Sequence, residues 1–241
     1  GRINIVGKLS KNKSYYLKLF KEKLSEESHS VYFVENDIKS AGKKMIIALQ
    51  REGYLQAQLL STDISFTKDN YANINLQIDE NILTYVRQVL FRGAKSYNNI
   101  ELKDEVEIES NKPLRMEVIE TSFDKLELFY KEAGYLEFKI KNKNASVIQY
   151  KPGQPYADIV FQIEEGPKIL VKDIVINGLR KTKKYVVIRE LDFERGDILN
   201  LSKVTTSIDR LEKTSLFSKV NIKSLEQNTS KSNRTIVVEL E

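Results

Sequence analysis

The sequence lacks most of the residues that build reactive sites. It has no cysteine and a single histidine in 241 residues. Without cysteine there is no disulfide, no thiolate metal site and no cysteine nucleophile. His29 lies in the polar segment 25–30, which favours a solvated loop position. No apolar run approaches the roughly 18 residues that a membrane-spanning helix needs. No glycine-rich phosphate loop follows a strand, because Gly178 is followed by Leu179 and Arg180 without further glycines.

The charges also point away from catalysis and nucleic acid. The chain carries 39 basic and 34 acidic residues, a net charge of +5, and most of its basic residues are lysines, which suit solvated faces and strand edges. We therefore expect no nucleic-acid partner. Glu105, Glu107 and Glu109 alternate like a carboxylate cluster, but the lysine and arginine side chains around them indicate a solvent-facing surface. The sequence predicts no enzyme activity, no metal and no cofactor.

What the sequence does contain is a repeat. Strands end in Gly7, Gly93 and Gly178, separated by 93 − 7 = 86 and 178 − 93 = 85 residues. A helix end followed by a strand occurs at Gly53, Gly134 and Ser215, with 134 − 53 = 81 and 215 − 134 = 81 residues between them. A closing strand of alternating apolar residues recurs at Ile74/Leu76/Ile78, Ile159/Phe161/Ile163 and Ile236/Val238/Leu240. Three independent markers at equal spacing indicate a tandem array.

Each repeat is predicted to run strand, helix, helix, strand, strand. The second helix has an apolar stripe at helical spacing, clearest in the middle repeat. The stripes are Ile38, Ala41, Met45, Ala48 and Leu49, then Ile119, Phe123, Leu126 and Tyr130, then Leu201, Val204, Ile208 and Leu211. The last two strands alternate with period two and form a hairpin with one covered face. The fold class is therefore α+β, with three two-layer domains at residues 1–82, 83–167 and 168–241.

The end of the second helix differs between repeats. Gly53 and Gly134 stand where a helix end needs a left-handed residue, which glycine adopts without a side-chain clash. Ser215 occupies this place in the third repeat. We expect its helix cap to be poorer or differently shaped.

Several of these segments resemble a known family. In the third repeat these are Ile-Val-Ile-Asn-Gly at 174–178, Gly-Asp at 196–197 and Leu-Phe-Ser-Lys-Val-Asn-Ile at 216–222. In the second repeat they are residues 128–136 and the Glu-Gly-Pro join at 165–167. They resemble the POTRA (polypeptide-transport-associated) domain, and the first repeat is a divergent copy. The resemblance implies three tandem domains, each a three-stranded sheet covered on one face by two helices. The last strand of each is central and the second strand lies on a free edge.

The resemblance also implies a function. POTRA domains form the periplasmic arm of outer-membrane β-barrel assembly and translocation proteins of the BamA/TamA superfamily. The implied partners are unfolded outer-membrane protein substrates, accessory assembly lipoproteins or periplasmic chaperones, and a C-terminal membrane β-barrel in the full-length chain. The implied location is the periplasm, tethered to the outer membrane by that barrel. Two alternatives stay open: a structural spacer without client binding, and the POTRA arm of a two-partner secretion or organelle import pore.

The expected mechanism rests on strand edges. An exposed edge strand offers unpaired N–H and C=O groups to an extended peptide, and lysines can guard such an edge. Residues 55–60 lack charge, and we expect them to form the preferred edge; a proline at Gln58 would remove one donor. The predicted peptide-binding residues are Leu55, Gln56, Ala57, Gln58, Leu59 and Leu60, then Phe138, Lys139, Ile140 and Lys141, then Val220, Asn221 and Ile222. Glu165, Gly166 and Pro167 form the predicted inter-domain hinge, stiffened by its proline.

Overall fold

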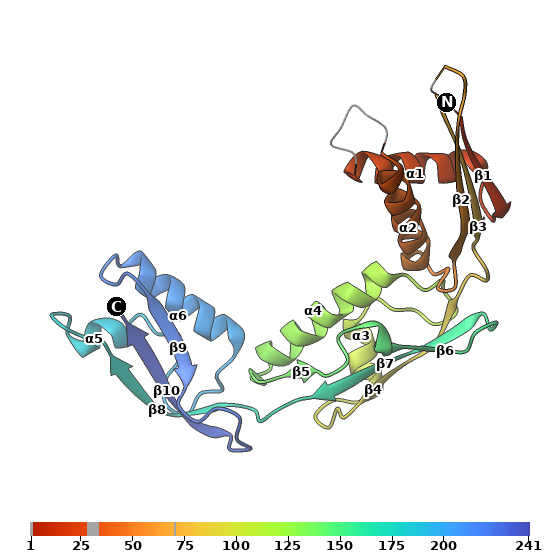
Figure 1. Cartoon of the computed structure of the whole chain (residues 1–241). Helices are drawn as coiled ribbons and strands as arrows, with labels where there is room; N and C mark the ends of the chain where they lie inside the picture. Colours follow the sequence, from red (N-terminus) through yellow and green to blue (C-terminus); the bar gives the residue numbers. More distant parts are fainter. Residues whose placement is uncertain (1, 28–33, 70) are drawn as a thin grey trace. The chain divides into compact units, whose positions relative to one another are not determined.

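The computed structural model describes residues 2–27, 34–69 and 71–241, and these residues form three β-sheets accompanied by helices (Figure 1). Contacts divide the chain into two compact units. One comprises residues 1–89, 108–120 and 148–159, and the other comprises residues 90–107, 121–147 and 160–241. The division passes through the middle sheet, whose architecture is given by its strand pairing. His29 lies outside the described residues.

The first repeat has the predicted order of elements. They are β1 (Ile3–Lys8), α1 (Lys13–Glu27), α2 (Glu35–Arg51), β2 (Gln58–Phe66) and β3 (Ala72–Asp79). The strand order is β1-β3-β2, with β1 parallel and β2 antiparallel to the central β3. Both helices lie on one side of this sheet (Figure 1). The resemblance had implied this arrangement of a central last strand with the second strand at an edge.

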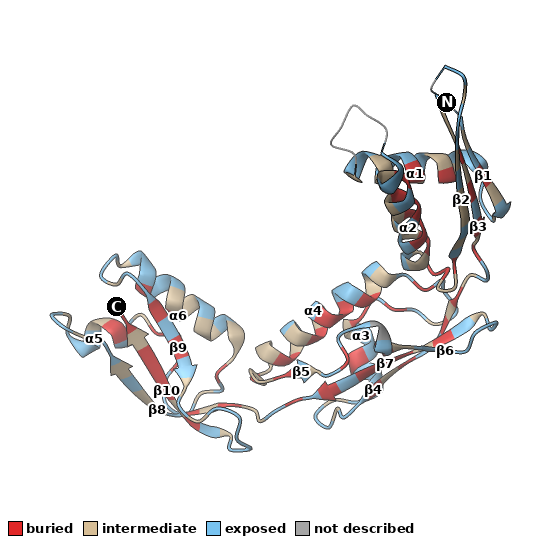
Figure 2. Cartoon of the chain, viewed as in Figure 1, coloured by how far each residue is buried: buried red, intermediate tan, exposed pale blue. Residues whose placement is uncertain are grey.

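The core of the first repeat lies between α2 and the sheet. The predicted stripe residues Ile38, Ala41, Met45 and Leu49 are buried, whereas Ala48 is only half-buried. Figure 2 shows these buried positions along α2. Full burial of an aliphatic side chain stabilises a fold by about 1.5–3 kcal/mol. Gly42 lets the helix approach β2, because a Cβ atom there would lie 3.0 Å from the side chain of Leu59.

The second repeat departs from the expected three strands. Its sheet has four, because an additional short strand pairs with the first half of β7. The strand order is β4-β7-β5, with β6 also on β7. The elements are β4 (Tyr85–Arg92), α3 (Asn99–Glu105), α4 (Met116–Glu132), β5 (Lys139–Ile140), a 3-10 turn η1 (Ala145–Val147), β6 (Ile148–Tyr150) and β7 (Tyr156–Glu164).

Aromatic side chains build much of the second core. Phe161 of β7 stacks on Phe91 at 5.3 Å between ring centroids, and Phe123 of α4 meets Phe161 edge-on at 5.6 Å. Tyr130 of α4 stacks on Phe138 at 4.2 Å. The predicted stripe of α4 (Ile119, Phe123, Leu126 and Tyr130) is buried throughout. Offset-stacked and edge-on aromatic pairs add about 0.5–1.5 kcal/mol each beyond the area they bury.

The third repeat again has three strands. Its elements are β8 (Leu170–Asn177), α5 (Lys184–Ile188), α6 (Leu201–Lys213), β9 (Val220–Ser224) and β10 (Asn233–Leu240). The strand order is β8-β10-β9, with β8 parallel and β9 antiparallel to β10. In the stripe of α6, Leu211 is buried, and Leu201, Val204 and Ile208 are half-buried. The helix cover is thinner than in the first repeat, because α5 has only five residues.

The strand-ending glycines are required by a close approach of backbones. Gly7, Gly93 and Gly178 have φ of 137°, 90° and 88°, in the left-handed region that favours glycine. A Cβ atom on them would lie 1.7, 2.2 and 1.8 Å from a carbonyl oxygen of the central strand. These carbonyls belong to Ile78, Ile163 and Leu240. The repeat marker therefore records a position in each domain where no side chain fits.

The cap at Ser215 differs from the other two, as expected. Ser215 is left-handed at φ 57°, whereas Gly53 and Gly134 have φ of 107° and 98°. The amides of Tyr54 and Tyr135 donate to the helix carbonyls of Leu49 and Tyr130. The amide of Leu216 instead donates to the Thr214 side chain at 3.3 Å. The third helix thus ends with a side-chain bond where the others use a backbone bond.

Candidate functional site: strand edges and buried loop carboxylates

The predicted edge of the first repeat begins later than expected. Only Gln58, Leu59 and Leu60 of the predicted residues belong to β2, which runs for nine residues to Phe66. Leu55 and Gln56 lie in a turn, closed by the Ala57 amide donating to Tyr54 O at 2.8 Å. Ala57 is 2% exposed and packs in the core. The prediction that Leu55, Gln56 and Ala57 are strand residues is wrong, because the chain must turn after the helix cap before it can pair.

The β2 edge is also interrupted near its start. The register with β3 shifts between Leu59 and Ser61, which leaves Leu60 as a bulge with 53% of its surface exposed. Bulges disturb edge pairing. Beyond the bulge, residues 61–66 pair regularly with β3, and Asp63 carries the one charge among them. Because β2 is the last strand of its sheet, the continuous free edge is at 61–66 rather than at 55–60.

The second repeat has only a short edge strand at the predicted place. Lys139 and Ile140 form β5, whereas Phe138 is buried against Tyr130 and does not pair. Lys141 lies beyond the strand, although its amide donates to Gln162 O at 2.8 Å. Its ammonium group lies 2.9 Å from the carboxylate of Glu164. Phe138 and Lys141 were thus wrongly predicted to be strand residues.

Asn142 explains why β5 ends. Its buried side chain donates to Val160 O at 2.7 Å and accepts from the Gln162 amide at 2.9 Å. The side-chain amide thereby does for β7 what a paired strand residue would do. The backbone turns away here and returns as β6, which pairs with β7 from Ile159 to Ala157. The outer side of β7 is therefore covered in three pieces.

The third edge lies where it was predicted. Val220, Asn221 and Ile222 belong to β9, a five-residue strand at the edge of its sheet. Val220 and Ile222 face the core, and the Asn221 side chain donates to Glu239 Oε2 at 2.9 Å. Lys223 forms an ion pair with the same carboxylate group at 2.6 Å. The charged groups here are tied to the neighbouring strand, and the edge is shorter than that of β2.

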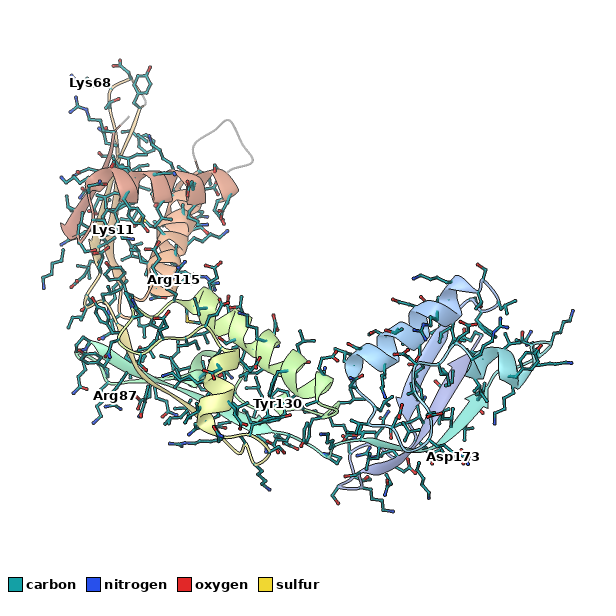
Figure 3. The ribbon with its side chains drawn as sticks, turned by 180° about the vertical axis from the view of Figure 1, so that it is seen from behind. Lys11, Lys68, Arg87, Arg115, Tyr130 and Asp173 are labelled. Atoms are coloured by element: carbon teal, nitrogen blue, oxygen red, sulfur yellow. The ribbon has the colours of Figure 1, made fainter. Side chains whose placement is uncertain are left out.

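The predicted hinge residue Glu165 has a defined structural role. Its carboxylate accepts the backbone amides of Lys95 and Ser96 at 2.8 and 2.9 Å and the Ser96 hydroxyl at 2.8 Å. Tyr130 donates its hydroxyl to the same carboxylate at 3.1 Å. The carboxylate therefore closes the loop that follows the glycine at the end of β4. Figure 3 labels Tyr130 at this place.

Burial and hydrogen bonds act oppositely on this carboxylate. Burial alone would raise the pKa of Glu165, but the hydrogen bonds from Ser96, Lys95 and Tyr130 outweigh it and hold the pKa below its ordinary value. Burial, and then the charge of Glu165, raise the pKa of Tyr130. The pair is thus a neutral phenol donating to a carboxylate that stays ionised.

The first repeat holds an equivalent carboxylate that the sequence interpretation missed. Glu80 is buried and accepts the Ser10 amide at 2.7 Å and the Tyr16 hydroxyl. The Ser10 hydroxyl bonds Tyr54 Oη at 2.6 Å, and Ser96 accepts from Tyr135 at 2.8 Å in the same way. A signal was present, because Glu80 and Glu165 are 165 − 80 = 85 residues apart, close to the glycine spacing.

The two joins between repeats share a hydrogen bond. The Thr84 amide donates to Gly53 O at 2.9 Å, and the Ile169 amide donates to Gly134 O at 3.0 Å. The glycine that caps each second helix thus also receives the first strand of the next repeat. Gly166 is left-handed at φ 69°. The stiffness of the join at 165–167 stays a prediction.

The described residues offer little for other chemistry. Within residues 2–27, 34–69 and 71–241, no group of three or more histidine, cysteine, aspartate or glutamate side chains could hold a metal ion. In the same residues, no helix is both long and apolar enough to cross a lipid bilayer. The features left for function are the strand edges and the loop carboxylates.

Comparison with known families agrees with this architecture. Residues 84–166 and 169–241 each match the family model described as POTRA, surface antigen variable number repeat. The chain belongs to the POTRA family. The matched segments correspond to the second and third repeats, and the same fold in the first repeat makes three tandem POTRA domains.

The relatives of this POTRA chain are distant. It is 22% identical over 173 residues to a protein named outer membrane protein assembly factor BamA from Nitratidesulfovibrio vulgaris. That match covers 70% of this chain and 21% of the relative. The crystal structure of POTRA domains 3–5 of Haemophilus influenzae BamA is 16% identical, with a TM-score of 0.56 over 100% of this chain and 94% of that one. The structural likeness shows that both chains share the fold.

Proposed function

We propose that these POTRA domains belong to the periplasmic arm of an outer-membrane protein assembly factor and receive unfolded β-barrel segments by strand addition. The family, and the assembly factor among its relatives, support the general role. The observation that carries the binding mechanism is the free edge of β2 at residues 61–66. An unfolded barrel strand is an extended peptide, and main-chain pairing accepts it whatever its side chains.

The β2 edge fits this task better than the others. Its residues 61–66 pair regularly with β3 and carry one charge, whereas β5 has two residues and β9 has five. Ser61 and Asp63 bond to each other at 3.1 Å, and both are polar groups that an added strand can accommodate. Of the predicted residues, Gln58, Leu59 and Leu60 remain part of this edge. Val220, Asn221 and Ile222 form a second, shorter one.

The remaining features of the proposal concern the whole protein. The chain spans 21% of the curated relative that it matches, so most of such a protein lies outside these residues. We place the arm in the periplasm, tethered to the outer membrane by a C-terminal β-barrel, with accessory lipoproteins or chaperones docking on it. The alternatives, a spacer or the arm of a secretion or import pore, share the fold and differ in what binds.

Peptide binding tests the proposal. A fluorescein-labelled barrel-strand peptide of about ten residues should bind the chain, and an N-methylated copy should not, because it lacks the main-chain donors. Backbone groups of successive residues in an antiparallel strand point to opposite sides. Of Thr62→Pro and Asp63→Pro, one therefore removes only an outward donor, and that folded variant should bind at least about tenfold more weakly, about 1.4 kcal/mol.

The controls decide between the mechanisms. Asn221→Pro and its neighbour Ile222→Pro make the matched change in β9, and the variant of this pair that stays folded should retain most of the binding. Equal binding of the peptide and its N-methylated copy would disprove main-chain pairing. Absence of binding to the unchanged chain would favour the spacer.

A further inference from the structure

The third repeat has a loop like the other two but no carboxylate on it. Counting three residues from the close glycine aligns Ser10, Ser96 and Lys181. In the first two repeats this residue's amide binds a buried glutamate. In the described part of the chain, no side-chain carboxylate bonds to residues 178–182.

The position of the missing group follows from the repeat. Glu80 and Glu165 stand two residues after Ile78 and Ile163, whose carbonyls lie against the close glycines. Leu240 makes this contact in the third repeat. The equivalent of the two glutamates is position 242, which is not among the 241 residues.

A hollow occupies the place where such a group would lie. It has a volume of about 650 Å³ and is lined by Gly178, Arg180, Lys181, Leu216, Ser218 and Glu241, among others. Leu216 stands where Tyr54 and Tyr135 bond the loop serine in the other repeats, and 55% of its surface is exposed. The hollow is therefore open at the position where the other two repeats are filled.

The charge of this loop is also distinct. Arg180, Lys181, Lys183 and Lys184 place four cations in five residues, and all four are exposed. Among the described residues, neither Arg180 nor Lys181 forms an ion pair. The second repeat carries Lys95 alone in its loop. In the first, Lys11 is paired with Glu52. An anion near Arg180 and Lys181 would meet both their charges and the loop amides.

We infer that the hollow between Gly178 and Leu216 is a binding site for a carboxylate carried on an extended segment that continues the direction of β10. The carboxylate accepts the Lys181 amide, as Glu80 and Glu165 accept those of Ser10 and Ser96. It has two sources with the same chemistry: an acidic residue at position 242 of a longer chain, or an acidic side chain of another protein.

Extending the chain tests this inference. Two proteins are made, the 241 residues followed by Glu-Gly-Pro, as at 165–167, and the same with Gln-Gly-Pro. We expect exchange of the Lys181 amide to be slowed at least about tenfold by the glutamate relative to the glutamine. The difference should vanish as the pH falls below the glutamate pKa, because the protonated acid has lost its charge. The matched Ser96 amide serves as an internal control, since Glu165 already binds it.

A second arm separates the two sources. The blocked tripeptide acetyl-Glu-Gly-Pro-amide, and its glutamine counterpart, are titrated into the 241-residue chain while the Lys181 and Gly178 amide signals are followed by NMR. Shifts with the glutamate peptide alone show that a separate acidic segment can occupy the site. Protection seen only in the extended chain assigns the site to the chain's own continuation. Equal behaviour of glutamate and glutamine in both arms would overturn the inference.

Discussion

The first and second repeats share their order of elements and differ at the edge beside the central strand. In the first, β2 runs for nine residues along β3. In the second, Asn142 replaces strand pairing with side-chain bonds to Val160 and Gln162, and the edge is divided between β5 and β6. A common topology therefore does not give the repeats a common binding edge, because one buried amide decides whether the strand continues.

The loop carboxylates show the opposite case. Glu80 receives its phenol from Tyr16 on α1, whereas Glu165 receives it from Tyr130 on α4. The carboxylate position and the loop amides are kept, while the helix that supplies the hydroxyl changes. The backbone positions define this arrangement, and different side chains complete it.

The largest expected effect tests what the repeats have in common. Gly93→Ala should destabilise the second repeat by about 3–5 kcal/mol, because its Cβ would lie 2.2 Å from Ile163 O. Gly7→Ala should act similarly on the first repeat. Hydrogen exchange of β7 and β3 amides measures each separately. Gly153→Ala is the control, since its φ is 79° with no atom within 4 Å, and it should cost about 1–2 kcal/mol. Equal costs at Gly93 and Gly153 would refute the close approach.

The carboxylates should differ in strength. Glu165→Gln should cost about 2–3 kcal/mol and Glu80→Gln about 1–2 kcal/mol, because Glu165 accepts four hydrogen bonds and Glu80 two. The folded pKa of Glu165 is lowered, so its contribution is present above the unfolded pKa of about 4.3 and is lost as pH falls through the folded value. Urea unfolding across this range, followed by exchange of β7 amides, should show a shallower acid dependence for Glu165→Gln. An unchanged acid dependence would contradict the assignment.

Removing Asn142 should weaken the broken edge. Asn142→Ala leaves the Val160 carbonyl and the Gln162 amide without their partner, at a cost of about 1–3 kcal/mol. Faster exchange of the Gln162 amide would report it. Asn144→Ala is the nearby control, because the Asn144 side chain bonds only within its own turn, to Ser146. If both variants lose equal protection at Gln162, Asn142 does not act as a strand substitute.

The helix cap of the third repeat extends the comparison. Ser215→Gly should raise the free energy of unfolding of that repeat by about 1 kcal/mol, because glycine adopts a positive φ without the strain of a side chain. Slower exchange at the end of α6 is the expected readout. Thr214→Gly, where the backbone is right-handed at φ −66°, should destabilise instead.

The smallest effect concerns a surface ion pair within one unit. Arg51 binds Glu120 through two bonds at 2.8 and 2.6 Å, but both side chains are 48% exposed. Arg51→Ala should therefore cost less than about 1 kcal/mol, and less still in 1 M salt. Thermal melts at both salt concentrations measure it. A larger, salt-independent loss would show that this contact holds the first join.

Much of the candidate site was visible in the sequence only as separate residues. The edge position of β9 followed from its alternation and from the family resemblance. The start of β2 did not, because the turn at Tyr54–Ala57 depends on packing beneath the helix cap. The short β5 did not either, since Asn142 reaches carbonyl and amide groups 18 and 20 residues away.

The sequence by itself determined the threefold repeat, the second-helix stripes and the close glycines, because periodicity and backbone freedom are properties of short segments. The tertiary structure decided which edges remain open and which carboxylates become buried. Those outcomes depend on groups about 70 residues apart, such as Ser10 with Glu80 and Ser96 with Glu165. Hydrogen bonds over that distance form only once the sheet has brought the ends of its strands together.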